Sequence, residues 1–172
     1  MWKLHSLRKV ISQSIPDLAK DPENFIVLVE GGSAASTSAK GLSFEYTYTI
    51  AITLLDYTGH TDALFVPLIA WLRVHQNELL ANPQTQAQGL QFQVELLNTG
   101  ACDIAIKVPV TERVIVKANP DHPTQLTCDH PPEPPIIGTA RVPEHWQLYL
   151  KDQLLAEWDI PTPPNEDRFE LY

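Results

Sequence analysis

The chain has 172 residues, of which 44% are hydrophobic, and its formal net charge is −9. This length predicts one domain with an appendage, and the apolar content is sufficient for a hydrophobic core. Its 12 basic residues are scattered along an acidic chain, which argues against a protein that grips nucleic acid through the phosphates. The start lacks the apolar stretch of a signal peptide, and no run of about 18 apolar residues occurs, so we expect a cytoplasmic protein with reduced cysteines.

The first predicted element is an amphipathic helix over residues 6–20. Its apolar side chains recur at three- and four-residue steps, and Ser6 is a suitable N-cap. Pro16 has no amide hydrogen and its ring clashes inside a helix, so we expect a kink or a break near Ser14. Residues 25–30 are rich in β-forming side chains and predict a short buried strand.

Residues 31–38 are small and are expected to form a connecting loop. Residues 42–55 then place an apolar or aromatic side chain at every even position up to Leu54. Because side chains alternate between the faces of a strand, this pattern predicts one long strand with an apolar face and a polar face. It is far longer than the usual strand of about 5–6 residues, which suits a sheet that extends beyond the core of one subunit. We therefore expect a protein that acts through surfaces and assembly.

A second helix is predicted over residues 62–80. Its wide apolar stripe indicates a helix that lies flat across a sheet, and Pro67 marks either a later start or a kink. Residues 90–96 and 103–110 alternate apolar and polar side chains on either side of an Asn-Thr-Gly turn, which predicts a hairpin. Pro109 donates no hydrogen bond, so an edge or a bulge is expected there.

The last third of the chain changes character. Residues 119–143 are rich in proline and predict an extended, partly polyproline-like connector. Residues 144–160 predict a small β-hairpin, and residues 161–172 are expected to be disordered. The sequence therefore predicts an α+β fold in which an antiparallel-rich sheet is packed by two helices within a core domain of residues 1–118. Because the connector carries little apolar surface, a chain that ends near Lys117 is expected to keep its fold.

Two groups of residues have side chains or backbone suited to ligand binding, and each has a simpler structural interpretation. The backbone amides of residues 31–38 suit a phosphate, but Lys40 does not fit the Gly-x-x-x-x-Gly-Lys-Ser/Thr spacing, which favours a plain loop. His122, Cys128 and His130 have metal-binding side chains. Their spacing fits no common zinc pattern, and the segment offers no obvious fourth ligand, so solvated loop residues are favoured.

Two further groups were considered for catalysis. Cys102 is a candidate nucleophile, but the neighbouring carboxylate of Asp103 opposes thiolate formation. Glu45 and Glu95 are candidates for an acid–base pair, yet each falls on the polar phase of a strand, where a charge is ordinary surface decoration. The sequence therefore favours no catalytic residue, no metal site and no cofactor.

The middle of the chain resembles a known family. The residues that carry the resemblance are Gly32-Ser33, Ala35-Ser36-Thr37, Leu42-Ser43-Phe44-Glu45, Tyr48-Thr49, Asp56, Thr58-Gly59, Asp62, Val66-Pro67, Ala70-Trp71-Leu72-Arg73 and Gln76. Together they are similar to the tail completion protein R (GpR) family of contractile-tailed temperate phages, over residues 7–113 and again at Leu148-Tyr149 and Trp158. The hairpin turn Lys151-Asp152-Gln153 departs from the Asn-Gly of the family, and the chain continues past Trp158 with Pro161-Thr162-Pro163-Pro164.

The resemblance implies a non-enzymatic role in virion assembly and a tail-terminator-like fold. It implies a homo-oligomeric ring, for instance a hexamer, that caps the head-proximal end of the tail tube and enables head–tail joining. The implied partners are the chain itself, the phage tail tube protein and neck or head completion proteins, without specific nucleic-acid binding or a membrane. The implied location is the bacterial host cytoplasm during assembly and then the virion tail. Among the matched and neighbouring residues, Ser33, Ser36, Thr37, Glu45 and Arg73 are the candidate contacts with a neighbouring subunit or partner.

Two alternatives stay open. One is a neck or head–tail adaptor protein, which also acts by assembly but binds the head side. The other belongs to a different class: a small cytoplasmic enzyme that binds a phosphate ligand through residues 31–38. A ring mass in solution favours the terminator, whereas a monomer that binds phosphate ligands favours the enzyme.

Overall fold

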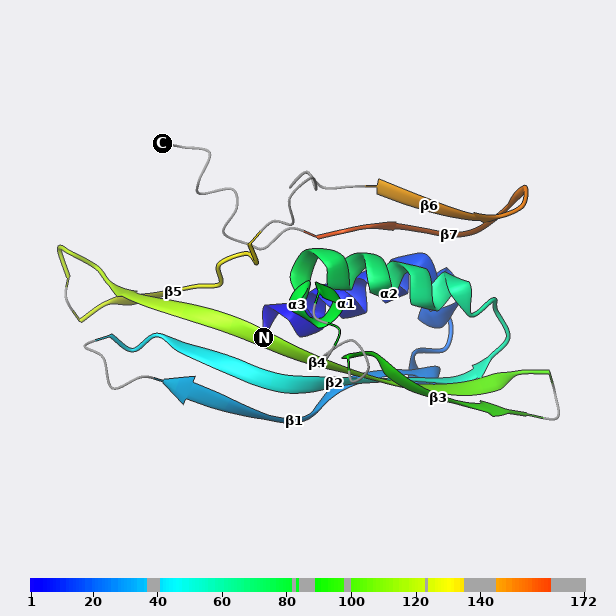
Figure 1. Cartoon of the computed structure of the whole chain (residues 1–172), viewed down its shortest axis with the longest axis horizontal. Helices are drawn as coiled ribbons and strands as arrows, with labels where there is room; N and C mark the ends of the chain where they lie inside the picture. Colours follow the sequence, from blue (N-terminus) through cyan, green and yellow to red (C-terminus); the bar gives the residue numbers. More distant parts are fainter. Residues whose placement is uncertain are drawn as a thin grey trace.

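The chain folds around one five-stranded antiparallel sheet, with the helices on one face and a two-stranded hairpin on the far side of the helices (Figure 1). The computed structural model describes residues 1–36, 41–81, 83, 89–97, 100–122, 124–134 and 145–161. In chain order the elements are α1 (Trp2–Ser14), the 3-10 helices η1 (Pro16–Ala19) and η2 (Pro22–Asn24), β1 (Phe25–Ser36), β2 (Phe44–Tyr57), α2 (Asp62–His75), α3 (Glu78–Ala81), β3 (Gln91–Leu96), β4 (Cys102–Ala118), β5 (Leu126–Asp129), β6 (His145–Leu150) and β7 (Gln153–Asp159). This architecture confirms the predicted α+β fold.

β2 lies at the centre of the sheet and confirms the predicted alternation. Tyr48, Ile50, Ile52 and Leu54 are at most 3% exposed and face the helices. The strand pairs with β1 on one side and with β4 on the other, and the order of the sheet is β1-β2-β4-β3. β5 pairs with the C-terminal end of β4, from Ile115 to Ala118. Each large apolar side chain buried in this way contributes about 1.5–3 kcal/mol, so the apolar face of β2 anchors the core.

α1 and α2 pack against each other on the buried face of the sheet. The indole Nε1 of Trp71 donates a hydrogen bond to Oγ of Ser6 at 2.9 Å, and both residues are buried. Ser6 is therefore an interior contact, and the predicted helix start at Ser6 is wrong, because α1 begins at Trp2. The predicted break is confirmed, since α1 ends at Ser14 and Pro16 opens the separate helix η1.

α2 is shorter than the predicted helix. It begins at Asp62 with Pro67 inside it, so the later start considered for this helix is wrong. It ends at His75, because Gln76 leaves the helical conformation with φ −148° and ψ 47°. The short helix α3 follows as a separate element, so the continuous helix predicted to residue 80 is also wrong.

β1 is longer than predicted and includes residues 31–36, which were expected to form a loop. After a register shift between Val29 and Gly31, the strand continues alongside β2, with Gly32 opposite Tyr48. A Cβ at Gly32 would lie 2.7 Å from the Cβ of Tyr48, so a side chain there would force the two strands apart. The small residues of this segment therefore allow the close approach of β1 and β2. Because residues 31–36 form a strand, the interpretation of residues 31–38 as a phosphate-binding loop is wrong where the structure describes them.

β4 has 17 residues and forms the predicted hairpin with β3. The predicted strand end at Val110 is wrong, because the buried phase continues through Glu112 and Val114. On the side of β4 away from β2, pairing with β3 stops at Lys107 and pairing with β5 starts at Ile115. Pro109 falls between these two pairings, as expected for a residue without an amide hydrogen.

The β6–β7 hairpin confirms the predicted C-terminal hairpin and packs on the helices. Ala156, Trp158 and Ile160 are at most 6% exposed and belong to the same hydrophobic cluster as the core of the sheet. The amide of Asp159 also donates to the side-chain oxygen of Gln13 on α1 at 3.3 Å. The proline-rich stretch contributes β5 to the main sheet, so these residues are more than a connector. None of the described helices is long and apolar enough to cross a membrane.

Candidate assembly surface

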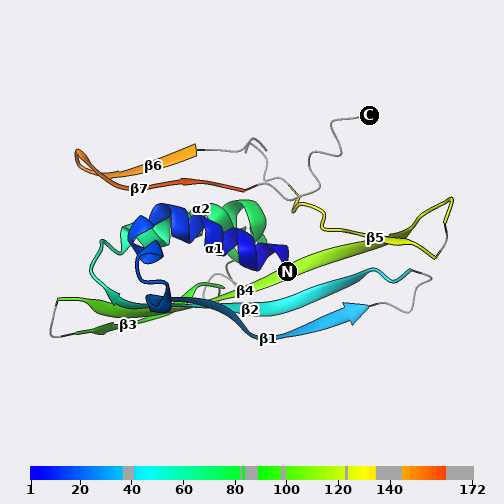
Figure 2. The same ribbon diagram turned by 180° about the vertical axis from the view of Figure 1, so that it is seen from behind.

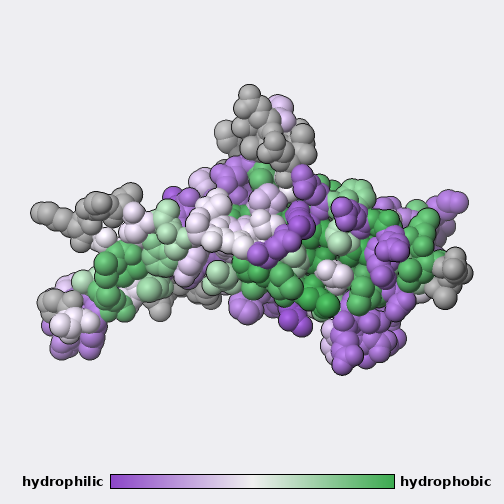
Figure 3. All heavy atoms as spheres, turned by 90° about the horizontal axis from the view of Figure 1, so that it is seen from below, coloured by the Kyte–Doolittle hydropathy of each residue, from purple (hydrophilic) through white to green (hydrophobic). Residues whose placement is uncertain are grey.

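The face of the sheet opposite the helices is uncovered, and we call it the open face. It presents Thr47, Thr49, Ala51 and Thr53 from β2, Ile26 and Leu28 from β1, and Ala105, Lys107 and Pro109 from β4. Ile26 and Leu28 are 41% and 46% exposed. Figure 3 views this side of the molecule and shows apolar areas interrupted by polar groups. Charged side chains also lie on this side, since Lys107 pairs with Glu30 at 2.7 Å, Glu45 stands opposite Arg113 and Glu95 stands opposite Asp103. A sheet face that mixes small, apolar and charged side chains has the composition of a protein–protein contact.

One end of the sheet projects beyond the helices, as Figures 1 and 2 show. We call this part the β-arm: residues 31–36, 44–47, 111–118 and 126–129. The rings of Phe44 and Tyr46 pack edge to face, with 4.8 Å between their centroids. A long strand therefore leaves the core of the subunit, as its length predicts, and carries partly buried aromatic rings with it.

The predicted contact residues fall in two places. Ser33 is exposed opposite Thr47, and Glu45 lies opposite Arg113, so both are on the open face of the β-arm. Ser36 ends β1, and its hydroxyl donates to the carbonyl of residue 43 at 3.0 Å. Arg73 is exposed on α2, in the other layer of the fold. Thr37 lies outside the described residues.

Glu112 holds the base of the β-arm to α1. It is 3% exposed, and its Oε1 accepts from the amide of Trp2 at 2.8 Å and lies 2.7 Å from Nδ1 of His130. Its Oε2 accepts from the hydroxyl of Tyr48 at 2.7 Å and from the amide of Lys3 at 3.2 Å. The free amides and the dipole at a helix N-terminus favour such a carboxylate, so Glu112 joins α1, β2, β4 and the segment after β5.

The protonation states of this cluster follow from its contacts. Burial by itself would raise the pKa of Glu112, but hydrogen bonds from Tyr48, Trp2 and Lys3 hold that pKa below its ordinary value. Burial, and then the hydrogen bond to Glu112, raises the pKa of the Tyr48 phenol well above its ordinary range. Near neutral pH the pair is therefore a carboxylate and a neutral phenol, which is a structural arrangement rather than a reactive one.

Lys3 and Gln76 extend the cluster to the end of α2. Nζ of Lys3 donates to the side-chain oxygens of Gln76 and Glu133, each at 2.8 Å. The amide of Thr111 donates to the same oxygen of Gln76 at 3.1 Å. The side chain of Gln76 therefore accepts a backbone hydrogen bond from β4 in the interval where neither β3 nor β5 pairs with that strand.

His75 completes the buried junction between the helices. Its ring lies 4.9 Å from the Trp2 ring and 5.1 Å from the Trp71 ring, and the residue is 2% exposed. Burial, and then the charge of Lys3, lowers the pKa of His75 to about 3, so the imidazole is neutral. Sequence reasoning missed this cluster. The available signal was Glu112, a charged residue on the otherwise apolar even phase of β4.

The candidate metal and catalytic residues are used in structural contacts or lie apart. His130 contacts Glu112, and Cys128 stands opposite Val116 in the β4–β5 pairing. No three histidine, cysteine or acidic side chains gather as metal ligands in the described part of the chain. Cys102 is buried and its Sγ lies 3.5 Å from the carbonyl oxygen of Tyr57.

The acid–base pair considered for Glu45 and Glu95 is wrong. Glu45 stands opposite Arg113 of β4, whereas Glu95 stands opposite Asp103. These two positions lie ten residues apart along one extended strand (113 − 103), so the carboxylates are at opposite ends of the sheet.

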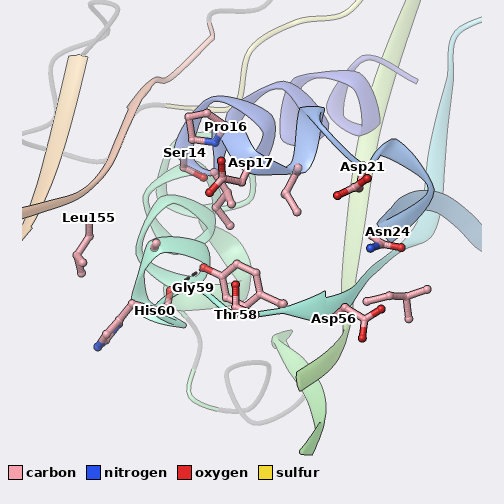
Figure 4. A pocket seen from close by; sticks show the side chains of 15 residues that line it. Ser14, Pro16, Asp17, Asp21, Asn24, Asp56, Thr58, Gly59, His60 and Leu155 are labelled. Atoms are coloured by element: carbon pink, nitrogen blue, oxygen red, sulfur yellow. Dashed lines mark hydrogen bonds between the residues drawn. The ribbon is translucent and has the colours of Figure 1, made fainter. Parts of the chain in front are cut away.

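A pocket of about 280 Å³ lies between η1 and the turn that follows β2 (Figure 4). The carboxylates of Asp17, Asp21 and Asp56 line it from separate segments. The turn needs Gly59, because a Cβ there would lie 2.5 Å from the hydroxyl of Tyr57. The pocket therefore has an acidic wall beside a tightly built turn, which suits contact with a positively charged group.

Comparisons with known proteins give the chain a family. No solved structure matches it. The model of the family described as P2 phage tail completion protein R (GpR) matches residues 1–134. The tail completion protein R of Escherichia phage P2 is 34% identical over 161 residues, which cover 92% of this chain and 99% of that protein. The resemblance noted in the sequence is thereby confirmed, and this chain belongs to the P2 phage tail completion protein R (GpR) family.

Proposed function

We propose that this chain completes phage tails by forming a ring on the head-proximal end of the tail tube. The observation that carries the proposal is the family match over residues 1–134, and the similarity to the phage P2 protein over 92% of the chain supports it. In this role the ring stops further addition of tube subunits and presents a surface to the neck. The protein acts by geometry and binding, without catalysis, in the host cytoplasm during assembly and then in the virion tail.

The structure supplies surfaces that suit such a role. The open face and the β-arm are extended, and they expose small and apolar side chains together with charged ones such as Glu45 and Lys107. Glu112, Tyr48 and Lys3, whose pKa values are all shifted, belong to the buried cluster in which Glu112 holds the start of α1 against β2 and β4. We propose that the tail tube protein and neck or head completion proteins bind these exposed surfaces, and that Ser33, Ser36, Thr37, Glu45 and Arg73 contribute contacts.

The acidic net charge of the chain is compatible with the proposed place of the ring at the end of a DNA-conducting tube. A net charge of −9 suits a ring through which DNA passes without sticking, because phosphates are repelled by acidic walls. The same charge suits basic surfaces on a protein partner.

The test is electron microscopy of tails assembled with and without the protein, combined with light scattering of the purified chain. We expect a ring-sized oligomer, alone or on tail tubes, and we expect tails that lack the protein to be overgrown or unable to join heads. Tails of normal length that join heads in its absence would contradict the proposed function.

A further inference from the structure

The outer sides of the two edge strands are unpaired in the described part of the sheet, and the bulge of β1 is confined to its step from Val29 to Gly31. β1 and β3 are the edge strands, and no described strand pairs with the outer side of either one. Natural edge strands are usually blunted by lysine, proline or bulges, because their free amides and carbonyls recruit other strands. β3 contains neither lysine nor proline, and the register of β1 is regular from Phe25 to Val29.

Both edges also expose large apolar side chains. On β3, Phe92, Val94 and Leu96 are 57%, 41% and 84% exposed. On β1, Ile26 and Leu28 are 41% and 46% exposed, but they lie on the open face, whereas the three β3 side chains lie on the helix face opposite Ile106, Ile104 and Cys102. An edge that is both unpaired and apolar is unfavourable in water, so these strands have the properties of a contact surface.

The directions of the edge strands are compatible with one continuous sheet. Every pairing from β1 to β2, β2 to β4 and β4 to β3 is antiparallel, so β1 and β3 run in opposite directions. A second copy placed beside β3 in the same orientation therefore presents its own β1 antiparallel to β3. The helices of both copies then stay on the same face of the extended sheet (Figure 1).

Each edge has mixed charges beside it, including Asp21 and Glu23 before β1 and Arg73 on α2, and one side chain of opposite sign at each edge is close to the edge strand. The guanidinium of Arg8 on α1 lies 5.8 Å from the centre of the Phe25 ring, at the start of β1. At the other edge, Phe65 of α2 packs on Phe92 of β3 at 4.9 Å, and Asp62 lies one helical turn before Phe65 on the same side of α2. The side chain of Asp62 is 58% exposed. Joining β1 to β3 therefore brings the side that carries Arg8 in one copy toward the side that carries Asp62 in the next.

We propose that β1 of one copy pairs with β3 of the next, so that the sheets of successive copies join and close into the ring. This inference rests on the proposed function, since the occupant of each edge is a second copy of the same chain. The contact is heterologous, because two different surfaces meet, and heterologous contacts form rings when their rotation closes. Strand pairing supplies backbone hydrogen bonds, Phe92, Val94 and Leu96 lie on the same face as Phe25, Val27 and Val29 of the next β1, and the charges of Arg8 and Asp62 favour this orientation.

The test is a concentration series of the full chain by light scattering. Arg8→Glu and Asp62→Lys each place like charges at every junction and should weaken association about tenfold or more. Because the two charges meet only between copies, an equimolar mixture of the two variants should regain association, and so should the double variant. Lys151→Glu and Asp152→Lys make the same changes of charge at the exposed β6–β7 turn and should leave association unchanged.

The outcomes separate the edge pairing from the ring itself. Edge pairing is overturned if both single variants associate as well as the wild type. It is also overturned if neither the mixture nor the double variant regains association although circular dichroism shows folded chains. In both cases the proposed ring assembly still stands. A wild-type chain that stays monomeric both alone and with tail tubes overturns both. If a charge variant does not fold, Leu96→Lys, at a residue that is 84% exposed, should weaken association, and unchanged association of that variant overturns edge pairing.

Discussion

Glu112→Gln should destabilise the protein, because the carboxylate accepts several hydrogen bonds at once. Glutamine keeps one acceptor oxygen, so the bonds from the Tyr48 hydroxyl and the Lys3 amide to Oε2, at 2.7 Å and 3.2 Å, meet an NH₂ group instead. Hydrogen bonds to a charged group contribute about 1.5–3 kcal/mol each, and the helix N-terminus adds a favourable charge interaction. We expect the free energy of unfolding to fall by about 2–4 kcal/mol out of a typical 5–15 kcal/mol.

The assay is urea unfolding followed by circular dichroism, with Glu45→Gln as the control at an exposed carboxylate. The pKa of Glu112 is lower in the folded protein than in the unfolded chain, so its contribution is complete above the unfolded value and is lost as the pH falls through the lowered folded value. The difference in stability between wild type and Glu112→Gln should therefore shrink below about pH 4. A difference under about 0.5 kcal/mol at pH 7, or one that persists unchanged in acid, would refute this reasoning.

Three further predictions concern the core, the hairpin and the absence of catalysis. Ile50→Asp should prevent soluble folding, because a buried unpaired carboxylate costs several kcal/mol, whereas Thr49→Asp on the open face should fold; equal soluble yields would contradict the strand register. Truncation after Lys117 should lower the melting temperature measured by circular dichroism, because it removes Trp158 from the hydrophobic cluster; an unchanged melting temperature would support the separable core expected from sequence. Cys102→Ser should leave infectivity within a few-fold of normal, and loss of infectivity with fold and oligomer intact would count against a non-enzymatic role.

The sequence predicted the elements whose pattern is set by burial on one face. β2 is the clearest case, since its alternation from Tyr48 to Leu54 matches the buried face of the sheet. The break after Ser14 was also predictable, because proline has a local effect on the backbone. The C-terminal hairpin followed from two short runs around a polar turn.

The wrong predictions share one physical cause. In each case polar or small residues pair or hydrogen-bond with residues that are distant in the sequence. Residues 31–36 look like a loop by composition, and only their pairing with the long strand β2 makes them a strand. β4 was predicted to end at Val110, but it continues through Glu112, whose burial depends on amides 109 or more positions away in the chain. Ser6 was taken for a helix cap, but its partner is Trp71 on another helix. Tertiary contacts of this kind leave no local signal.

The candidate contact surface was only partly predictable. Glu45 and Ser33 were placed on the polar phase of strands, and they lie on the open face of the β-arm. The edges of the sheet were not predictable in the same way, because the strand order that makes β1 and β3 the outer strands depends on the whole topology.

Electron microscopy of purified tail tubes mixed with the purified chain tests the central claim most directly. The account predicts a ring of density at one end of each tube, the end that joins the head, and no binding along the sides. Uniform binding along the tube, or tubes whose ends stay bare at concentrations where the chain is folded, would contradict the account.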